Sequence, residues 1–145
     1  MRLLFLAASL MLLALSQSVA ADGHTTIELP AETYSVKGKL LNLELSDTGG
    51  TVTVSGKARK YGMVYLMYNM KRNPSSTSQG SFTGKGMAID DDGKRVAAVR
   101  NGMWKREGTS FTIHSLDDLS DGSQNLCKSV LDIASSEFEM TFYLM

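Results

Sequence analysis

Arg100 is the residue of this chain whose position points most clearly to chemistry. It belongs to the alternating segment 94–106 and lies on the face that carries small and apolar residues. A guanidinium group on such a face is costly to bury unless its charge is paired, and it can bind a carboxylate or phosphate through two parallel hydrogen bonds. We therefore expect Arg100 to hold an anionic or amphipathic small molecule in an apolar cup. The alternatives are a structural ion pair or a side chain that reaches water.

Six further residues are candidates for the wall of that cup. Aromatic side chains often line small-molecule sites, and a few polar groups orient the ligand there. For each aromatic candidate, packing in the hydrophobic core is the alternative role. The candidates are Trp104, Tyr65, Tyr68, Phe82, Phe111 and the polar Asn69.

The other reactive residues form no catalytic or metal-binding motif. The two histidines, His24 and His114, lack the spacing of a zinc site and the partners of a catalytic triad. No serine lies in a GxSxG motif, and the single cysteine, Cys127, rules out a disulfide within the chain and a CxxC pair. We predict no catalytic residue, no metal and no cofactor, and we expect Cys127 to be a buried thiol.

Composition and the N-terminal segment limit the class of protein. Fifteen Lys+Arg balance 15 Asp+Glu, so charge gives no reason to expect nucleic-acid binding. Residues 1–20 begin with an arginine, continue with an apolar run and end in small residues, as secretory signal peptides do. The run is shorter than the roughly 20 residues that a helix needs to cross a bilayer. We expect cleavage after Ala20 or Ala21 and a periplasmic or secreted domain over 21–145, with no membrane span.

A period of two in the apolar residues predicts strands along the rest of the chain. Turns rich in glycine and aspartate separate these segments at short intervals. The fold class is therefore all-β. We favour an antiparallel up-and-down barrel of eight or nine strands, because closure removes exposed edges, and a two-sheet sandwich is the alternative. The predicted strands are 25–29, 33–45, 51–58, 61–71, 80–90, 94–106, 109–117, 125–133 and 137–144.

The hairpin around Gly93 allows a first register to be predicted. A two-residue loop would place Lys85 directly opposite Arg100, and like charges in that position are destabilising. A three-residue loop with Gly93 in the left-handed conformation avoids this pairing. It places Phe82 opposite Gly102, so that an aromatic ring covers a glycine.

The next hairpin allows a second register to be predicted. A two-residue loop at 107–108 pairs Trp104 with Phe111, which is a favourable aromatic pair. The same register places Ser115 opposite Arg100. Side chains on alternate positions of these strands then form an apolar inner face with Arg100 as its one charged member.

The strand 61–71 is apolar on both faces, so the alternation leaves its orientation open. An outer face of this kind is unusual for a solvated strand and predicts contact with a loop or with a partner subunit in a homodimer. The two sets are Met63, Tyr65, Met67 and Asn69 on one face and Val64, Leu66, Tyr68 and Met70 on the other.

The glycine-rich segments 82–86, 90–93 and 102–108 resemble those of many small bacterial calycin-type barrels, and the resemblance implies a lipocalin-like architecture. We expect an exported barrel that binds a small organic molecule. One alternative is an isomerase or cyclase-type enzyme, which would need a tyrosine, an arginine and a carboxylate together in its cavity. The other is a surface module that binds polyanions through the basic segment 37–106, and binding of this kind would weaken with salt.

Overall fold

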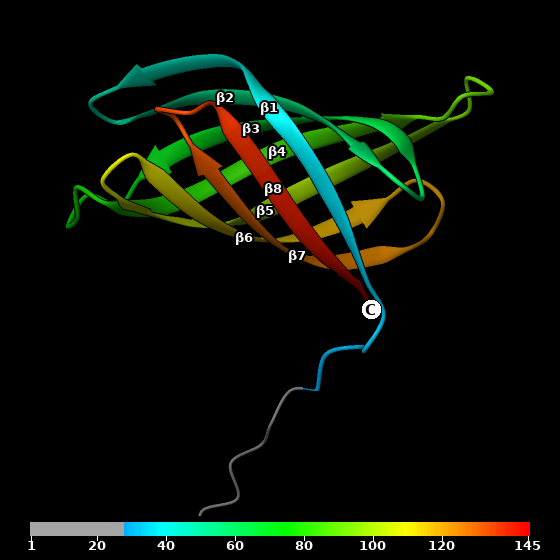
Figure 1. Ribbon diagram of the computed structural model, residues 1–145. Coiled ribbons are helices and arrows are strands. Elements are labelled where there is room, and N and C mark those ends of the chain that lie inside the picture. The colour runs from blue at the N-terminus through cyan, green and yellow to red at the C-terminus, as the bar shows by residue number, and fades with distance from the viewer. Residues whose placement is uncertain (1–27) are drawn as a thin grey trace, which may run out of the picture.

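Eight antiparallel strands form a closed barrel in the computed structural model, which describes residues 28–145 (Figure 1). Each strand pairs with the next one along the chain, and the last strand pairs with the first. The predicted up-and-down barrel is confirmed, and the sandwich alternative is excluded. The strands are β1 (Thr33–Ser46), β2 (Gly49–Ala58), β3 (Gly62–Arg72), β4 (Gln79–Ile89), β5 (Arg95–Glu107), β6 (Ser110–Leu119), β7 (Gln124–Asp132) and β8 (Glu137–Leu144).

Eight of the nine predicted strands lie within two residues of their predicted bounds. The ninth, 25–29, falls mainly outside the described residues, and Glu28 and Leu29 are not in a strand. The predicted signal peptide at 1–20 also lies outside the described residues. In the part of the chain that the structure describes, no helix is long and apolar enough to cross a membrane.

Closure of the barrel selects one of the two apolar faces of β3. Side chains alternate along a strand, so one face must point into the barrel and the other outward. Val64, Leu66, Tyr68 and Met70 are buried in the interior. The opposite face, which begins with Met63, is therefore the outer surface of the barrel.

The predicted β4–β5 hairpin is confirmed. The backbone N–H of Asp90 donates to the Lys94 carbonyl oxygen at 3.1 Å, which closes a three-residue loop, and Gly93 has a φ of +79°. Phe82 lies opposite Gly102 as predicted. A methyl group at Gly102 would lie only 2.7 Å from the Phe82 ring, so glycine is needed for the ring to pack there.

The predicted β5–β6 register is wrong by two residues. The observed turn consists of Gly108 and Thr109, and Trp104 lies opposite Ile113 rather than Phe111. A turn at 107–108 would need a positive φ at Glu107 if it were of type I′, whereas the observed turn needs one only at its first residue, where Gly108 has a φ of +60°. A shift by two residues keeps every side chain on its predicted face.

The corrected register changes the residue opposite Arg100. Arg100 lies opposite Asp117 on β6, and Ser115 lies opposite Gly102. The inward arginine therefore faces a carboxylate on the neighbouring strand.

Candidate functional site

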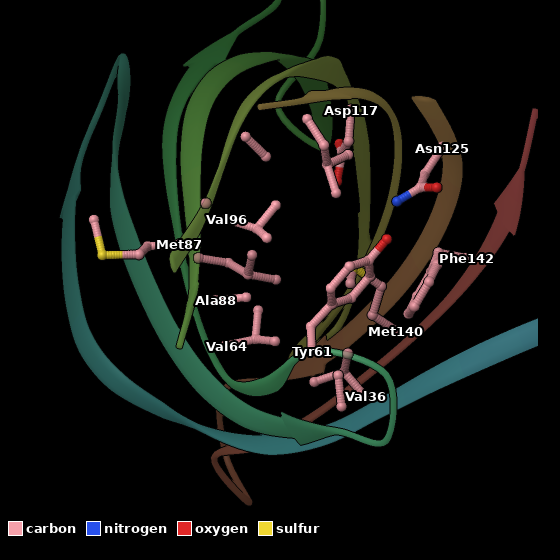
Figure 2. Close-up of a pocket in the computed structure, with 15 residues that line it drawn as sticks. Val36, Tyr61, Val64, Met87, Ala88, Val96, Asp117, Asn125, Met140 and Phe142 are labelled. Carbon is pink, nitrogen blue, oxygen red and sulfur yellow. The ribbon is translucent and has the colours of Figure 1, made fainter. Parts of the chain in front are cut away.

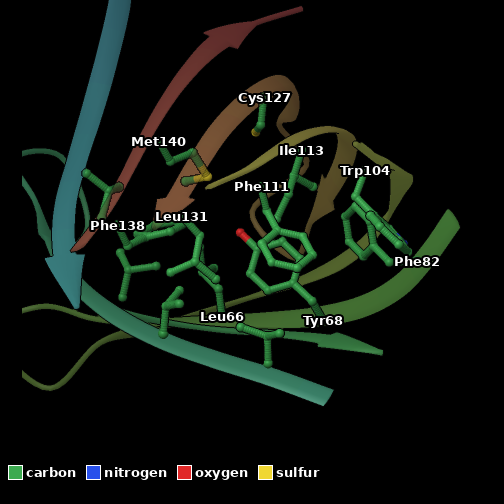
Figure 3. Close-up of a cluster of buried hydrophobic side chains, with 14 of the residues drawn as sticks. Leu66, Tyr68, Phe82, Trp104, Phe111, Ile113, Cys127, Leu131, Phe138 and Met140 are labelled. Atoms are coloured by element: carbon green, nitrogen blue, oxygen red, sulfur yellow. The ribbon is translucent and has the colours of Figure 1, made fainter. Parts of the chain in front are cut away.

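The interior of the barrel has an aromatic half and a half with small side chains. In the aromatic half, the rings of Tyr68 and Phe82 are 5.0 Å apart between centroids, and those of Trp104 and Phe111 are 5.7 Å apart (Figure 3). The Nε1–H of Trp104 donates to the backbone oxygen of Ser81 at 3.1 Å. These large side chains fill their half of the barrel and leave the other half as the place for a cavity.

A cavity lies at the barrel end that carries the β2–β3, β4–β5 and β6–β7 turns (Figure 2). We call it the mouth cavity. Its volume is about 40 Å³, which corresponds to about three water molecules. Small side chains from β2 to β5 leave this space, and larger ones complete its wall. The lining residues are Val36, Ala58, Val64, Gly86, Ala88, Val96 and Ala98, together with Tyr61, Leu66, Met87, Asp117, Leu119, Asn125, Met140 and Phe142.

A buried ion pair lies beside the mouth cavity. The Arg100 Nε donates to Asp117 Oδ2 at 2.8 Å, and the two side chains are 0% and 6% exposed. The Arg100 Nη2 also donates to Ser115 Oγ at 3.2 Å. A Cβ at Gly86 would lie 3.4 Å from Arg100 Cδ, which is an ordinary van der Waals contact. The pair is therefore held by the neighbouring strands β5 and β6.

The guanidinium remains charged despite complete burial. Its carbon lies 4.7 Å from the centroid of the Tyr68 ring and 6.0 Å from that of Phe82, so aromatic faces cover the cation. Burial would lower the pKa of Arg100, but Tyr68 and the Asp117 carboxylate more than offset this, and the pKa lies above its ordinary value. The buried cation is thus paired with the Asp117 side chain and covered by aromatic rings.

Asp117, and not Arg100, borders the mouth cavity. We expected Arg100 to bind a carboxylate of a ligand, but it pairs with the Asp117 carboxylate of the protein itself. The arrangement around Arg100 is that of the alternative role, a structural ion pair. A molecule in the cavity meets the carboxylate side of this pair.

The predicted site residues divide into two groups. Trp104, Phe82, Phe111 and Tyr68 lie in the interior with Arg100, in the packed aromatic half rather than around the mouth cavity. The remaining two do not belong to the interior, and their placement in an apolar cup is corrected.

Tyr65 and Asn69 lie on the outer surface of β3. Tyr65 is 42% exposed, and Asn69 accepts a long hydrogen bond of 3.4 Å from the Thr51 hydroxyl on β2. The prediction took residues from both faces of an ambiguous strand, and closure of the barrel leaves only the Tyr68 face inside.

Three polar side chains at the mouth cavity carry buried oxygen atoms without a partner. These atoms are Tyr61 Oη, Asp117 Oδ1 and Asn125 Oδ1, and none has a hydrogen-bond partner among residues 28–145. Figure 2 shows the three side chains converging on the barrel interior from different elements. Buried polar atoms nearly always have partners. Six buried side-chain atoms of the described residues lack one, and three of the six lie on residues that line the mouth cavity, which makes the cavity a candidate site for a polar group.

None of these three residues was among the predicted site residues, although parity could have found two of them. Asp117 is two positions after Ser115, and Asn125 is two positions before Cys127. Both therefore share the inward face assigned to those neighbours. Tyr61 gives no such signal, because it precedes β3 in a turn and reaches the interior through its long side chain.

Cys127 is buried as predicted and is part of the same polar group. Its Sγ donates to Asp117 Oδ2 at 3.3 Å. Burial and the nearby carboxylate raise the pKa of the thiol to about 12. In this neutral form the thiol is a poor nucleophile and donates to Asp117.

The basic residues of the middle segment do not form one patch around the mouth cavity. Two of them precede β3 and two end it, so the pairs lie roughly 30 Å apart along an 11-residue strand. Within residues 28–145, no group of three or more His, Cys, Asp or Glu side chains could hold a metal ion. The residues that flank β3 are Arg59, Lys60, Lys71 and Arg72.

Comparison with protein-family models, curated proteins and solved structures gives no match to this chain. The interpretation of the site therefore depends on its geometry.

Proposed function

We propose that the barrel is an exported binding protein that holds the polar head of a small, uncharged amphipathic molecule in the mouth cavity. The observation that carries this proposal is the set of three buried oxygen atoms without partners at one apolar cavity. A ligand that supplies hydrogen bonds there replaces those that the side chains lose when they are buried. A calycin-like carrier function is in keeping with the closed barrel and with the signal-peptide pattern in the sequence.

The size of the mouth cavity limits what enters it. About 40 Å³ accommodates a head group of about three non-hydrogen atoms, whereas cavities that hold drug-sized ligands are about 300–1,000 Å³. The remainder of the ligand must extend out of the open end of the barrel past Tyr61, whose ring centroid lies 5.9 Å from that of the buried Phe142. A primary amide or a hydroxyl on a short hydrocarbon chain meets both conditions.

The charges beside the cavity favour a neutral head group. Asp117 Oδ2 is already paired with Arg100 Nε, so a further charge would leave a net charge buried beside the pair. A carboxylate head would face the Asp117 carboxylate, and an ammonium head would be a second cation on a carboxylate that Arg100 already pairs. A primary amide can donate to Asp117 Oδ1 and accept from the Tyr61 hydroxyl or the Asn125 amide. We thus propose an uncharged ligand in place of the anionic one that the inward arginine suggests.

Matched probes of one chain length test the choice of head group. Hexanamide, hexanoate and hexylammonium are titrated into the ¹⁵N-labelled protein, and NMR shifts are followed at residues 61, 117 and 125. We expect hexanamide to bind at least about tenfold more tightly than either ion, because each ion buries an uncompensated charge. Equal binding of hexanoate, or no binding of hexanamide at any site in the interior, would overturn the proposal.

The tyrosine hydroxyls provide a matched pair of variants. Tyr61→Phe removes the hydroxyl at the cavity and keeps the ring, and we expect it to weaken hexanamide binding about fivefold to tenfold. Tyr65→Phe makes the same change on the outer surface, where the side chain is exposed, and should leave binding unchanged. Equal effects of the two variants would show that the probe binds elsewhere. Native mass spectrometry of protein purified from its source identifies a natural ligand directly.

The enzyme alternative has one supporting observation. Tyr68, Arg100 and Asp117 form the tyrosine–arginine–carboxylate group that such an enzyme would need. However, Tyr68 and Arg100 are completely buried, and only Asp117 borders the cavity. Two of the three groups could not touch a substrate in this conformation, so the geometry supports binding better than catalysis.

A further inference from the structure

The outer surface of β3–β6 has features that ligand binding in the mouth cavity does not use. A hollow of about 570 Å³ lies over these four neighbouring strands, and its lining includes Tyr65, Met67 and Met87. Val99, on the same surface, is 58% exposed, and Met103 farther along β5 is 69% exposed. Exposed apolar side chains that cluster in this way are typical of a surface that meets another protein.

Two opposite charges flank β5 on this surface, one on each side of Val99. Lys85 lies opposite Val99 on one side, and Asp118 lies opposite Val99 on the other. The row across the sheet therefore reads positive, apolar, negative. Among the described residues neither charge has a salt-bridge partner, and Asp118 only accepts a hydrogen bond from Gln124 at 3.2 Å.

We propose that this face forms a homodimer with a second copy of the chain, related by a two-fold axis that runs along β5. Rotation about such an axis exchanges the two sides of β5, so Lys85 of each copy meets Asp118 of the other. The interface then contains two equivalent contacts between Lys85 of one copy and Asp118 of the other. A two-fold interface of this kind requires a self-complementary surface, and the row from Lys85 to Asp118 is self-complementary.

The charges in this row favour the axis along β5 over the other simple arrangement. A two-fold axis perpendicular to the strands would place Lys85 on Lys85 and Asp118 on Asp118, which is repulsive. With the axis along β5, the outward residues of this strand meet their own copies, so the interface is centred on the apolar Val99 and Met103, and Arg95 and Lys105 lie toward its two ends. Val99 and Met103 then pack against Val99 and Met103 of the second copy, which removes two of the most exposed apolar side chains from water.

Two charge reversals provide the test, with sedimentation velocity over a concentration series as the measurement. Lys85→Asp and Asp118→Lys each create two like-charge contacts in the dimer and should each weaken dimerisation at least about tenfold. When the two variants are mixed, every contact joins opposite charges again, so a heterodimer should form from two monomeric proteins. The mixture is the decisive sample, because no effect within one chain can explain its recovery.

Controls separate the interface from the fold. Lys57→Asp reverses an exposed charge on β2, away from the proposed interface, and should leave the dimer intact, while circular dichroism confirms that all variants are folded. A monomeric wild-type protein, single variants that still dimerise, or a mixture that stays monomeric would each overturn the proposal. None of these results affects the mouth cavity inside the barrel, so binding of hexanamide is tested separately.

Discussion

Replacement of Arg100 by methionine tests whether the buried ion pair is a structural unit. Methionine keeps much of the apolar stem but removes the 2.8 Å contact with Asp117, the 3.2 Å contact with Ser115 and the cation over the Tyr68 ring. Asp117 would keep one donor, the Cys127 thiol at 3.3 Å. The variant therefore contains a buried carboxylate without its counter-ion.

The expected destabilisation is large. Removal of one partner of a buried ion pair typically costs about 3–5 kcal/mol, out of about 5–15 kcal/mol for a domain. Arg100 is 0% exposed, so water screens the ion pair very little. The expected loss of unfolding free energy is therefore the full value of about 3–5 kcal/mol. With a urea m value of about 2 kcal/mol/M, the midpoint of unfolding should fall by about 2 M.

Urea titrations followed by fluorescence measure this change, because the chain has a single tryptophan, the buried Trp104. Arg106→Met is the matched control, since Arg106 is an exposed arginine on the same strand, and it should change the midpoint little. The double variant Arg100→Met/Asp117→Leu removes both charges and should recover most or all of the lost stability.

A small loss of stability would contradict this prediction. If Arg100→Met lost less than about 1 kcal/mol of unfolding free energy, removal of the cation would not leave an uncompensated buried carboxylate. If the double variant were as unstable as the sum of the two single variants, the two side chains would not be coupled.

Two further predictions concern the thiol and the glycines. Relative to Cys127→Ala, the wild-type protein should lose about 1.4 kcal/mol of unfolding free energy per pH unit above about pH 9, because the unfolded thiol ionises near 9.0 and the folded thiol only near 12. A difference that stays constant between pH 8 and 10 in urea titrations would contradict this. Gly102→Ala should cost about 1–3 kcal/mol in thermal melts, since its methyl group would collide with the His114 carbonyl oxygen and the Phe82 ring. Gly93→Ala, which meets no atom within 4 Å and only strains a φ of +79°, should cost less, and the opposite order would contradict the packing argument.

The strands and their faces follow from the local pattern of residues. Side chains alternate along a strand whatever it pairs with, so a period of two predicts where strands lie and which residues share a face. This is why the inward position of Arg100 and the burial of Cys127 were predicted correctly. It is also why the error of two residues at Gly108 moved no side chain to the wrong face.

The pairing of strands and the closing of the barrel supplied what the local pattern lacks. Turn geometry depends on which residue takes a positive φ, and Gly108 at the first turn position set Asp117 opposite Arg100. For β3, both faces are apolar, and the choice between Tyr65 and Tyr68 came from the position of the interior.

The mouth cavity depends on contacts between residues far apart in the chain. Asp117 and Asn125 are paired across the β6–β7 hairpin, and Tyr61, which precedes β3, meets them because β8 pairs with β1 and closes the sheet. Alternation assigns each strand residue to a face but carries no information about which residues lie across the interior. The β5–β6 register gives the inward Arg100 its partner Asp117, and closure of the barrel adds Tyr61 to Asp117 and Asn125 in a candidate binding site.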